Sequence, residues 1–417
     1  MLNQDYIRTA RAKGLRERAI IYKHALRNVM IPLLTIIGLF VALAMTGTVL
    51  TETVFTRPGL GKMLVDAIEA RDYPLAQGVI TVFTMIIVTV NLIVDVLYAA
   101  FDPRVAYKEG VRAMALTSKQ VPQTLETAGA EPGTVHWQLQ RRARRWRKYV
   151  PIALGVTLIV LMCVMAIMAS VLAPFNPSAQ SSEYVLKGPG AGGHHLLGTD
   201  EYGRDLLSRI IWGTRVSLQV GLVSVLVGFG LGVPGGLMAG FLGGTTETAI
   251  MRLTDMLMAF PTLLLALLIV TALGGSLVNE ILAIGVALTP HFVRLAHSLA
   301  LTTKTHDYIM AARALGGSSL RIMLRHIFPN TISTLLVVAT LYIATAIRTE
   351  AGLSFLGLGV PPPTPSWGNI LSEGRQYIKD CPWLTTFSGL AIMLAVLAFN
   401  LMGDALRDVL DPRLRGE

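Results

Sequence analysis

The side chains of this chain that could do chemistry do not form a catalytic site. ATP hydrolysis needs a phosphate loop of the form G-x-x-x-x-G-K-[ST], whose backbone amides hold the phosphate groups. The one Gly-Lys pair, Gly61-Lys62, is followed by Met63 and lacks the first glycine. The two cysteines, Cys163 in an apolar run and Cys381 in a loop, provide neither a disulfide framework nor a metal-binding spacing. We therefore expect no catalytic residue, no metal site and no cofactor bound directly by this chain.

Ionisable residues within apolar runs are the next candidates, because charges inside a membrane usually mark a functional site. The clearest are Arg252, Asp255, Arg294 and His297. Each lies near the end of its run, where it can reach water or a partner. Asp95 and Asp404 lie in the last turns of two further runs and can simply mark the cytoplasmic boundary. A structural role is favoured for all of them.

The elements that position these residues are apolar helices. Hydrophobic residues make up 53% of the chain and charged residues 15%, with a mean hydropathy of +0.56. A soluble protein carries about 25% charged residues, so the composition indicates a membrane protein. The net charge of +10 lies beside apolar runs rather than in aromatic-basic stretches, which favours membrane topology over nucleic-acid binding. We predict an all-α polytopic membrane protein with no nucleic-acid partner.

Eight segments are long and apolar enough to cross a membrane. A spanning helix needs about 20 mostly apolar residues, because lipid offers the backbone no hydrogen bonds. The predicted spans are Ile31 to Val54, Leu75 to Ala100, Val150 to Ala173, Val216 to Phe241, Thr248 to Ala272, Val278 to Ala296, Thr331 to Thr349 and Leu384 to Met402.

Basic residues set the predicted orientation, because they concentrate on the cytoplasmic side. They cluster in the opening segment, before the third span at Arg141 to Lys148, and after the last span. Both termini are therefore expected in the cytoplasm of a cell with a bacterial-type inner membrane, and the opening segment does not resemble a cleavable signal. Residues 174–210 then form an external loop, as do residues 352–382. Residues 105–149 are predicted to be a cytoplasmic linker.

An internal repeat organises the chain. Asp5-Tyr6-Ile7 and Ala10 to Gly14 recur as Asp307-Tyr308-Ile309 and Ala312 to Gly316, and His24 with Asn28 recurs as His326 with Asn330. Further on, Thr51-Glu52, Gly59 to Gly61, Asn91 with Asp95, and Asp102 to Arg104 recur as Thr349-Glu350, Gly357 to Gly359, Asn400 with Asp404, and Asp411 to Arg413. Most matched residues are polar or glycine, which disfavours chance. Two copies in the same order indicate a parallel repeat around one transport path.

Each copy begins with a predicted helix-turn-helix. Small, strongly helix-forming alanines precede Gly14 in the first copy and Gly316 in the second. Glycine tolerates a positive φ and permits a sharp turn. A second helix with apolar residues at helical spacing then leads back to the membrane. The small residues allow close approach by a partner's groove.

At these residues the sequence resembles the permease subunits of binding-protein-dependent ABC importers. Their cytoplasmic "EAA" loop has an acidic-Ala-Ala pattern, then a glycine, an apolar residue and a proline. The match is Met310-Ala311-Ala312, Gly316, Ile327 and Pro329 in the second copy, and Arg8-Thr9-Ala10, Gly14, Ile31 and Pro32 in the first. The acidic residue is absent from both copies, and Thr9 replaces an alanine. In that family the loop docks into a cleft of the ATPase subunit.

The resemblance implies a type I ABC importer transmembrane domain and a coupling loop over residues 298–330. The residues that it assigns to ATPase coupling are Ala10, Ala12, Gly14, His24, Asn28, Asp307, Ala311, Ala312, Gly316, His326, Pro329 and Asn330. It also implies partners other than the membrane lipid that surrounds the chain. These are ABC ATPase subunits that bind ATP and magnesium, an extracytoplasmic solute-binding protein and, as an open option, a second permease chain.

A second match narrows the family to the dipeptide/oligopeptide (peptide/nickel) group. It covers the stretches from Leu197 to Arg209, Gly213 to Leu218, Leu353 to Gly359 and Pro365 to Gly368. The external motif residues are Gly198, Thr199, Asp200, Gly203, Arg204, Asp205, Ser208 and Arg209. Thr199 or Asp200 can cap a helix, and Arg204 and Arg209 can pair with Asp200, Glu201 or Asp205. A structural surface helix and a direct contact with the binding protein both remain open.

The unequal copies suggest a fusion. Four spans precede the second copy and have no counterpart before the first. We expect residues 1–104 to be the C-terminal part of one permease, 105–149 the linker and 150–417 a nearly complete second permease with six spans. Met114 opens a fresh polar segment, as a new reading frame would. Sequencing the locus tests this hypothesis, because an intact upstream frame that continues into these residues would exclude it.

The expected function is import of peptides or similar solutes by alternating access, driven by separate ATPases. An ion-coupled secondary transporter is an alternative that would need paired acidic residues at mid-membrane, and the sequence offers no convincing mid-span carboxylate. A non-transporting remnant is a third interpretation. The solute could be a dipeptide, a longer peptide, a nickel chelate, glutathione or a sugar oligomer.

Overall fold

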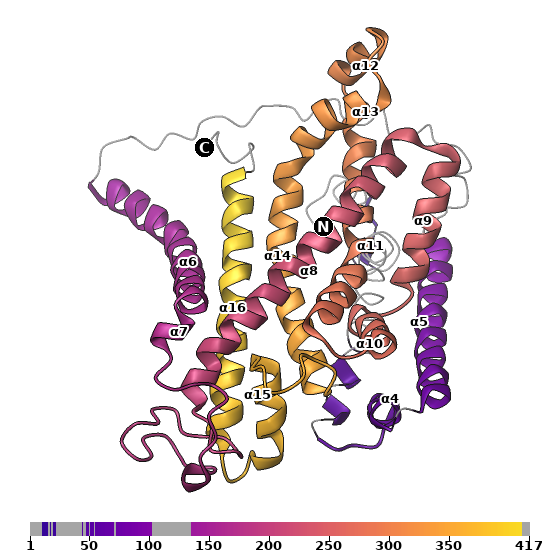
Figure 1. The fold of residues 1–417 in the computed structure, drawn as a ribbon. Helices are drawn as coiled ribbons and strands as arrows, with labels where there is room; N and C mark the ends of the chain where they lie inside the picture. Colours follow the sequence, from indigo (N-terminus) through magenta and orange to yellow (C-terminus); the bar gives the residue numbers. More distant parts are fainter. Residues whose placement is uncertain are drawn as a thin grey trace.

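The computed structural model describes residues 11–15, 17, 20–21, 44, 47–49, 51–53, 55–70, 72–101 and 135–410. In these residues the regular structure is helical, apart from two isolated bridges. Long helices run between two ends of the molecule (Figure 1), which we name after short helices that they carry. The α12 end carries α12 (Asp307–Ala314) and α13 (Ser319–Ile322), and the α15 end carries α15 (Trp367–Gly374).

The other helices connect or extend these two ends. In chain order they are α4 (Leu60–Glu69), α5 (Tyr73–Phe101), α6 (Val135–Ile167), α7 (Ala169–Leu172), η3 (Ser182–Tyr184), α8 (Leu206–Leu242), α9 (Gly244–Met258), α10 (Thr262–Leu273), α11 (Leu277–Thr303), η4 (Met323–Ile327), α14 (Phe328–Phe355), η5 (Arg375–Tyr377) and α16 (Pro382–Leu410).

The predicted spans are helices wherever the structure describes them. By length and apolar composition, six helices can cross a membrane, and the bent pair α9 and α10 makes a seventh candidate. These seven correspond to the predicted spans from Leu75 to Met402. The span predicted from Ile31 to Val54 lies almost wholly outside the described residues.

Two predicted spans are not continuous helices. The span predicted from Val150 to Ala173 is α6 up to Ile167 and then the short α7, which begins after Met168. We also expected a single helix from Thr248 to Ala272, but α9 and α10 meet at an angle of 89°. The break falls at Phe260-Pro261, where Pro261 caps α10 with a ψ of 138°. Proline has no N–H to donate, and its ring disfavours helical dihedrals at the preceding residue. Hydropathy does not register this break, because both halves are apolar.

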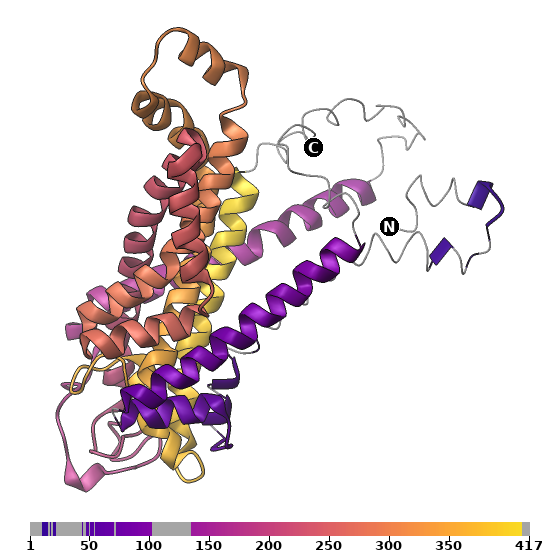
Figure 2. The ribbon, with the colours of Figure 1, turned by 90° about the vertical axis from the view of Figure 1, so that its right-hand side faces the viewer.

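Four predicted loops are shorter than expected, because helices extend into them. Helix α14 begins at Phe328 and runs to Phe355, and α11 runs to Thr303, so the loops placed at 298–330 and 352–382 are both shortened. Helix α8 begins at Leu206, so the external loop that we placed at residues 174–210 ends at Asp205. Helix α6 begins at Val135, so the last part of the linker predicted at 105–149 is helical and continuous with the third span. The rest of that linker, up to residue 134, lies outside the described residues. Figure 2 shows α5 and the first part of α6 both leaning away from the other long helices.

Helices α8 and α11 pack along a row of glycines that was not predicted from the sequence. Gly228, Gly232, Gly236 and Gly240 recur every four residues and therefore share one face of α8. A Cβ built on Gly236 would lie 2.3 Å from the carbonyl oxygen of Val293 on α11. Small residues at this spacing let two membrane helices approach closely. The spacing alone could have predicted a close-packing face on α8, but not that α11 is its partner.

The structure reproduces the internal repeat in its helices. Helices α5 and α16 each have 29 residues. The register that aligns Asn91 with Asn400 also aligns the first and the last residues of the two helices. In both copies a short helix, α4 or α15, precedes this long helix. Matched polar positions in the sequence therefore correspond to matched elements in space.

Candidate functional site

The segment after α11 has the predicted helix-turn-helix form. Helix α12 ends at Ala314, and the chain turns at Gly316, which has a φ of +79°. Gly14 of the first copy has a φ of +73°. The amide of Gly316 donates to the carbonyl of Arg313 at 3.0 Å, and the amide of Gly14 donates to that of Arg11 at 2.9 Å. Both copies thus make the same left-handed turn, which favours glycine.

This helix-turn-helix segment has a buried apolar side and an exposed apolar side. Its inner side packs into the hydrophobic core through Ile309, Ile322, Met323 and Ile327, whose exposures are 7% or less. Its outer side exposes Tyr308, Met310, Leu315, Leu320 and Leu324, with Leu315 89% exposed. We call these five residues the apolar outer face. Exposed apolar patches at a water-facing end usually mark an interaction site.

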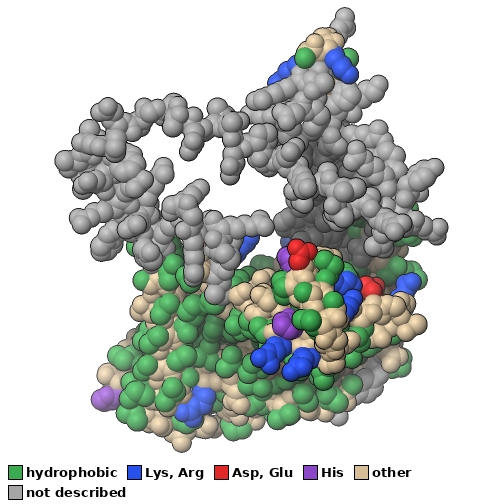
Figure 3. Space-filling model, turned by 90° about the horizontal axis from the view of Figure 1, so that it is seen from above, with side chains coloured by type: hydrophobic (Ala, Val, Ile, Leu, Met, Phe, Trp, Pro, Cys, Tyr) green, Lys and Arg blue, Asp and Glu red, His purple; other side chains and the backbone are tan. Residues whose placement is uncertain are grey.

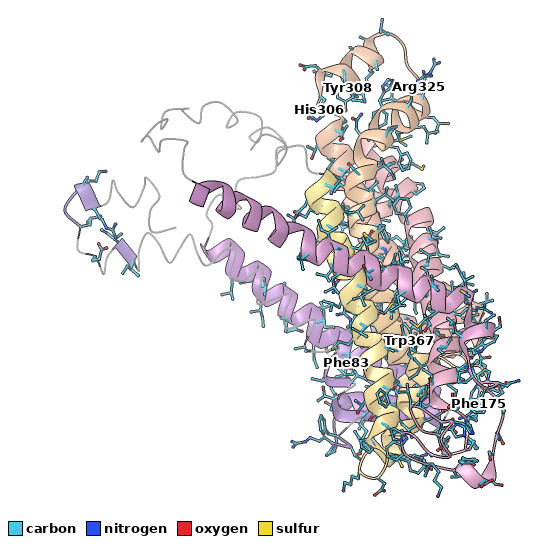
Figure 4. All side chains as sticks on the ribbon, turned by 90° about the vertical axis from the view of Figure 1, so that its left-hand side faces the viewer. Phe83, Phe175, His306, Tyr308, Arg325 and Trp367 are labelled. Atoms are coloured by element: carbon cyan, nitrogen blue, oxygen red, sulfur yellow. The ribbon has the colours of Figure 1, made fainter. Side chains whose placement is uncertain are left out.

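Basic and apolar side chains share this end of the molecule. Figure 3 looks down on it and shows hydrophobic, basic and acidic side chains lying next to one another. Figure 4 places His306, Tyr308 and Arg325 on the projecting segment, far from Phe175 at the opposite end. The rings of His306 and Tyr308 stack with centroids 5.6 Å apart.

The projecting segment is held to α8 by two contacts. The Nζ of Lys304 donates to the carbonyl oxygen of Gly240 at 2.7 Å. The guanidinium of Arg313 lies 5.1 Å from the ring centre of Phe241. Both partners are at the last turn of α8, where cations are favoured by the helix dipole. The segment therefore contacts a helix that runs the length of the bundle.

The return to the membrane contains one turn of π-helix, η4. Pro329 lies in the first turn of α14, directly after it. Proline cannot donate the backbone bond that an α-helix would require there, and π-turns often occur where the regular ladder is interrupted. The side chain of Asn330 donates to the carbonyl of His326 at 2.6 Å.

The predicted coupling residues are mostly at the surface. Ala12, Gly14, Asp307, Ala311, Gly316, Pro329 and Asn330 are exposed, whereas Ala312 and His326 are half-buried. Ala10, His24 and Asn28 lie outside the described residues.

The external motif forms a buried polar network at the α15 end. Thr199, Asp200, Arg204, Asp205, Ser208 and Arg209 are all 4% exposed or less. Asp200 accepts from the Nε of Arg204 at 2.6 Å and from Arg209. Both arginines also donate to Glu373, at 3.0 Å from Arg204 and 2.6 Å from Arg209. Two guanidinium groups thus share two carboxylates.

This network corrects one prediction and confirms another. The cap of α8 is Asp205, which accepts from the amide of Ser208 at 2.8 Å, so capping by Thr199 or Asp200 was wrong. The expected pairing of both arginines with Asp200 is confirmed. Glu373 was missed, because it lies more than 160 residues away along the chain. The motif is not a surface helix, since its charged side chains are buried.

The two glycines of the motif are required by close packing. Gly203 has a φ of +72°, and a Cβ there would lie 1.9 Å from the carbonyl oxygen of Ser181. Gly198 has a φ of +86°, and its Cβ would lie 2.7 Å from the carbonyl oxygen of Lys187. The motif folds the external loop against itself and ties it to α8 and α15.

Of the four ionisable residues singled out near span ends, three make side-chain contacts across helices. Arg294 pairs with Asp255 at 2.8 Å, with both side chains about half exposed. The imidazole of His297 lies 2.8 Å from a carboxylate oxygen of Glu247. In the described part of the chain, no group of three or more His, Cys, Asp or Glu residues could hold a metal ion.

Two buried carboxylates were not predicted from the sequence. Glu350 on α14 and Glu280 on α11 both have no exposed surface. Each lies nearer the end of its helix than the middle, which is why neither stood out as a mid-span charge. Glu350 accepts from the hydroxyl groups of Ser217 at 3.0 Å and Ser354 at 3.1 Å.

Comparison with known proteins gives a family match for this chain. The family model described as the binding-protein-dependent transport system inner membrane component matches residues 1–107 and 232–416. Solved structures of the methionine ABC transporter MetNI in inward-facing conformations are similar over 49% of this chain, with 20% identity and a TM-score of 0.42.

Several relatives are more similar in sequence. The di/tripeptide transport system permease protein DppC of Pseudomonas aeruginosa is 46% identical over 63% of this chain and 88% of that protein. The dipeptide permease protein DppC of Escherichia coli is 45% identical over 63% of this chain and 88% of its own length. The glutathione permease protein GsiD of Pectobacterium atrosepticum is 41% identical over 64% of this chain and 89% of its own.

The family model covers more than half of the chain, and the relatives match over most of their length. The chain therefore belongs to the inner membrane components of binding-protein-dependent transport systems, and it is an ABC importer permease rather than an enzyme.

Proposed function

We propose that this permease moves peptides or related small solutes into the cytoplasm. The observation that carries the proposal is the identity of 41–46% to permeases named for di/tripeptides, dipeptides and glutathione, over nearly their whole length. Separate ABC ATPase subunits bind ATP and magnesium. A solute-binding protein delivers the solute from outside, and both termini of this chain face the cytoplasm.

In this proposal the apolar outer face docks onto the ATPase. Five large apolar side chains project from one short helix-turn-helix, and the opposite side of that segment is anchored in the core. A partner's groove would bury these side chains, at about 25 cal/mol for each Å² of apolar surface. The residues predicted for coupling, from Asp307 to Asn330, belong to this segment.

The transport cycle is alternating access. ATP closes the ATPase dimer, and the docked segment transmits that closure to the helices, which open outward to receive the solute. Hydrolysis reverses the change. ATP can shift this equilibrium only by as much as its affinity for the two states differs.

The organisation proposed for the chain is a fusion of two permease parts. Residues 1–104 correspond to the end of one permease, residues 150–417 to a second, and a further permease chain can complete the first. The matched helices α5 and α16 and the matched turns at Gly14 and Gly316 support this proposal.

A purification from native membranes tests the proposal. The tagged chain should bring ATPase subunits with it, and the complex should hydrolyse ATP faster when the solute-binding protein and a dipeptide are added. Leu320→Ser on the apolar outer face should weaken this co-purification. The matched control is Ile378→Ser, because Ile378 is an apolar side chain of similar exposure at the opposite end, at 53% against 62%.

Other outcomes identify the competing interpretations. A chain that inserts normally but carries no ATPase would favour a non-transporting remnant. Uptake that needs no ATP would favour an ion-coupled transporter, which the family membership does not favour. If the Leu320 and Ile378 variants lost co-purifying ATPase subunits to the same extent, the apolar outer face would have no specific role in docking.

A further inference from the structure

Two buried carboxylates from different helices lie in one layer of the bundle. Glu350 of α14 is held by Ser217 of α8, and one turn further along these helices a Cβ on Gly221 would lie 2.7 Å from Ile347. Glu280 is in the first turn of α11, and the chain entering this turn reaches the same layer. A Cβ on Gly275 would lie 3.6 Å from the carbonyl oxygen of Gly359. A Cβ on Gly359 would lie 2.6 Å from the Cα of Ser354, whose hydroxyl binds Glu350. Helices α8, α11 and α14 therefore bring both acids together toward the α15 end.

The carboxyl groups of Glu350 and Glu280 differ in their hydrogen-bond partners. Glu350 accepts two hydroxyl hydrogen bonds, from Ser217 and Ser354. The backbone amide of Val360 faces Glu280, but neither oxygen of that carboxylate has a hydrogen-bond partner among the described residues. Glu280 has no exposed surface, so bulk water does not replace the missing partner.

Both oxygens of Glu280 are among the few buried polar atoms of the described residues without a partner, whereas Ser224 lies two turns outside the layer. In the part of the chain that the structure describes, four buried side-chain polar atoms lack a partner. Three of them are the two oxygens of Glu280 and the hydroxyl of Ser224. Ser224 lies seven residues after Ser217 and so shares its face of α8, two turns closer to the α12 end. A buried polar group without a partner requires an explanation such as an ion or a ligand.

Within the described residues, the layer contains no positive charge of its own to pair with the two acids. A buried carboxylate is costly unless a cation or donors satisfy it. Among the described residues, no Lys, Arg or His side chain pairs with Glu280 or Glu350. Glu280 is in the first turn of α11, where the helix dipole favours the ionised carboxylate.

We propose that Glu280, with Glu350, forms a subsite in the membrane path for the N-terminal ammonium group of a peptide in transit. Peptides have an α-amino group that is largely protonated at neutral pH. An ammonium group has three N–H donors, which can satisfy both unpartnered oxygens of Glu280. The layer is closed in this conformation, so the ammonium group enters when the bundle opens. The inference rests on peptide import as the proposed function.

Uptake by the complete complex tests the subsite. The chain is reconstituted into liposomes with its ATPase partners and solute-binding protein, and ATP-driven uptake of alanylalanine is measured. Glu280→Gln keeps the shape of the side chain and removes the charge, and Glu280→Asp keeps the charge. Asp255→Asn is the matched control, because it neutralises a carboxylate of a half-exposed ion pair outside the buried layer. The binding protein is a separate chain, so its own recognition of the peptide stays unchanged.

We expect Glu280→Gln to lower uptake at least about tenfold, as loss of a charge-assisted hydrogen bond does. Glu280→Asp should retain most of the uptake, and Asp255→Asn should match the wild type. If Glu280→Gln took up alanylalanine as fast as the wild type, the subsite would be refuted, but peptide import would still hold. Absence of alanylalanine uptake by the wild-type chain would instead refute peptide import.

A second measurement uses the unaltered chain and does not depend on folding of a variant. A hydrophobic carbodiimide modifies buried carboxyl groups, and mass spectrometry reports the modified fraction of Glu280. Alanylalanine, delivered by the binding protein during ATP turnover, should lower that fraction several-fold. Equal modification of Glu280 with and without the peptide would overturn the subsite.

Discussion

Removing the charge of Asp200 should release the external loop from the bundle. Asp200 accepts from Arg204 and Arg209, and its other oxygen accepts from the backbone amides of Tyr202 and Arg204, both at 2.9 Å. In Asp200→Asn the amide oxygen can keep the two backbone bonds. The new NH₂ group, however, would face two guanidinium groups. Glu373 alone would then balance two buried positive charges.

The magnitude follows from burial. The exposures of the Arg209 and Asp200 side chains are 1% and 2%, so solvent cannot screen the uncompensated charge. Removing one partner of a buried pair costs about 3–5 kcal/mol. At 1.4 kcal/mol per factor of ten, local opening of the loop should rise by about a hundredfold to a few thousandfold. The external segment from Ser181 to Asp205 should open without unfolding of the glycine-packed helices.

Hydrogen exchange followed by mass spectrometry measures this opening. Peptides from residues 181–205 should exchange faster by about two to three orders of magnitude, whereas peptides from α11 should not change. Glu201→Gln is the control, because it alters only exposed contacts with Gln376 and Tyr377 and should change the exchange little. Unaltered exchange in Asp200→Asn would refute the assignment of the network as the anchor of the loop.

Two further predictions concern the helix pair and the cysteine at the α15 end. Gly236→Ala should destabilise the permease in detergent by about 1–3 kcal/mol through overpacking against Val293. Gly230→Ala, where a Cβ meets nothing within 4 Å, should leave stability unchanged or raise it, and equal thermal midpoints for the two variants would refute the close packing. Burial raises the pKa of the Cys381 thiol, so less thiolate exists at neutral pH. A maleimide should therefore label Cys381 slowly at pH 7 and faster as the pH rises or the chain unfolds, and rapid labelling of the folded chain at pH 7 would contradict the buried position.

Hydropathy and the repeat predicted most of the fold, because both depend on residues near one another in sequence. Apolar runs located the spans, and Gly14 and Gly316 located the turns. The break at Phe260-Pro261 was also a local signal, but the continuous apolar run outweighed it. The glycine row from Gly228 to Gly240 was visible in the sequence as a period of four.

Interactions between distant segments could not be predicted in the same way. The external motif identified Asp200, Arg204 and Arg209 as a unit, but nothing local to it indicates Glu373 on α15. Glu280 and Glu350 look like ordinary residues near helix ends. Only the packing of α8, α11 and α14 buries them together. Pairings of this kind depend on topology, which a single sequence specifies weakly.

Helix α8 connects the two ends of the permease as one mechanical element. Its 37 residues span about 55 Å at 1.5 Å per residue. Its first turn is capped by Asp205 within the external ion network, and its last turn holds Lys304 and Arg313 of the projecting segment. The glycine row joins it to α11 along much of that length. A tilt imposed at one end of α8 would therefore displace the other end, which links the proposed docking surface to the ion network around Asp200.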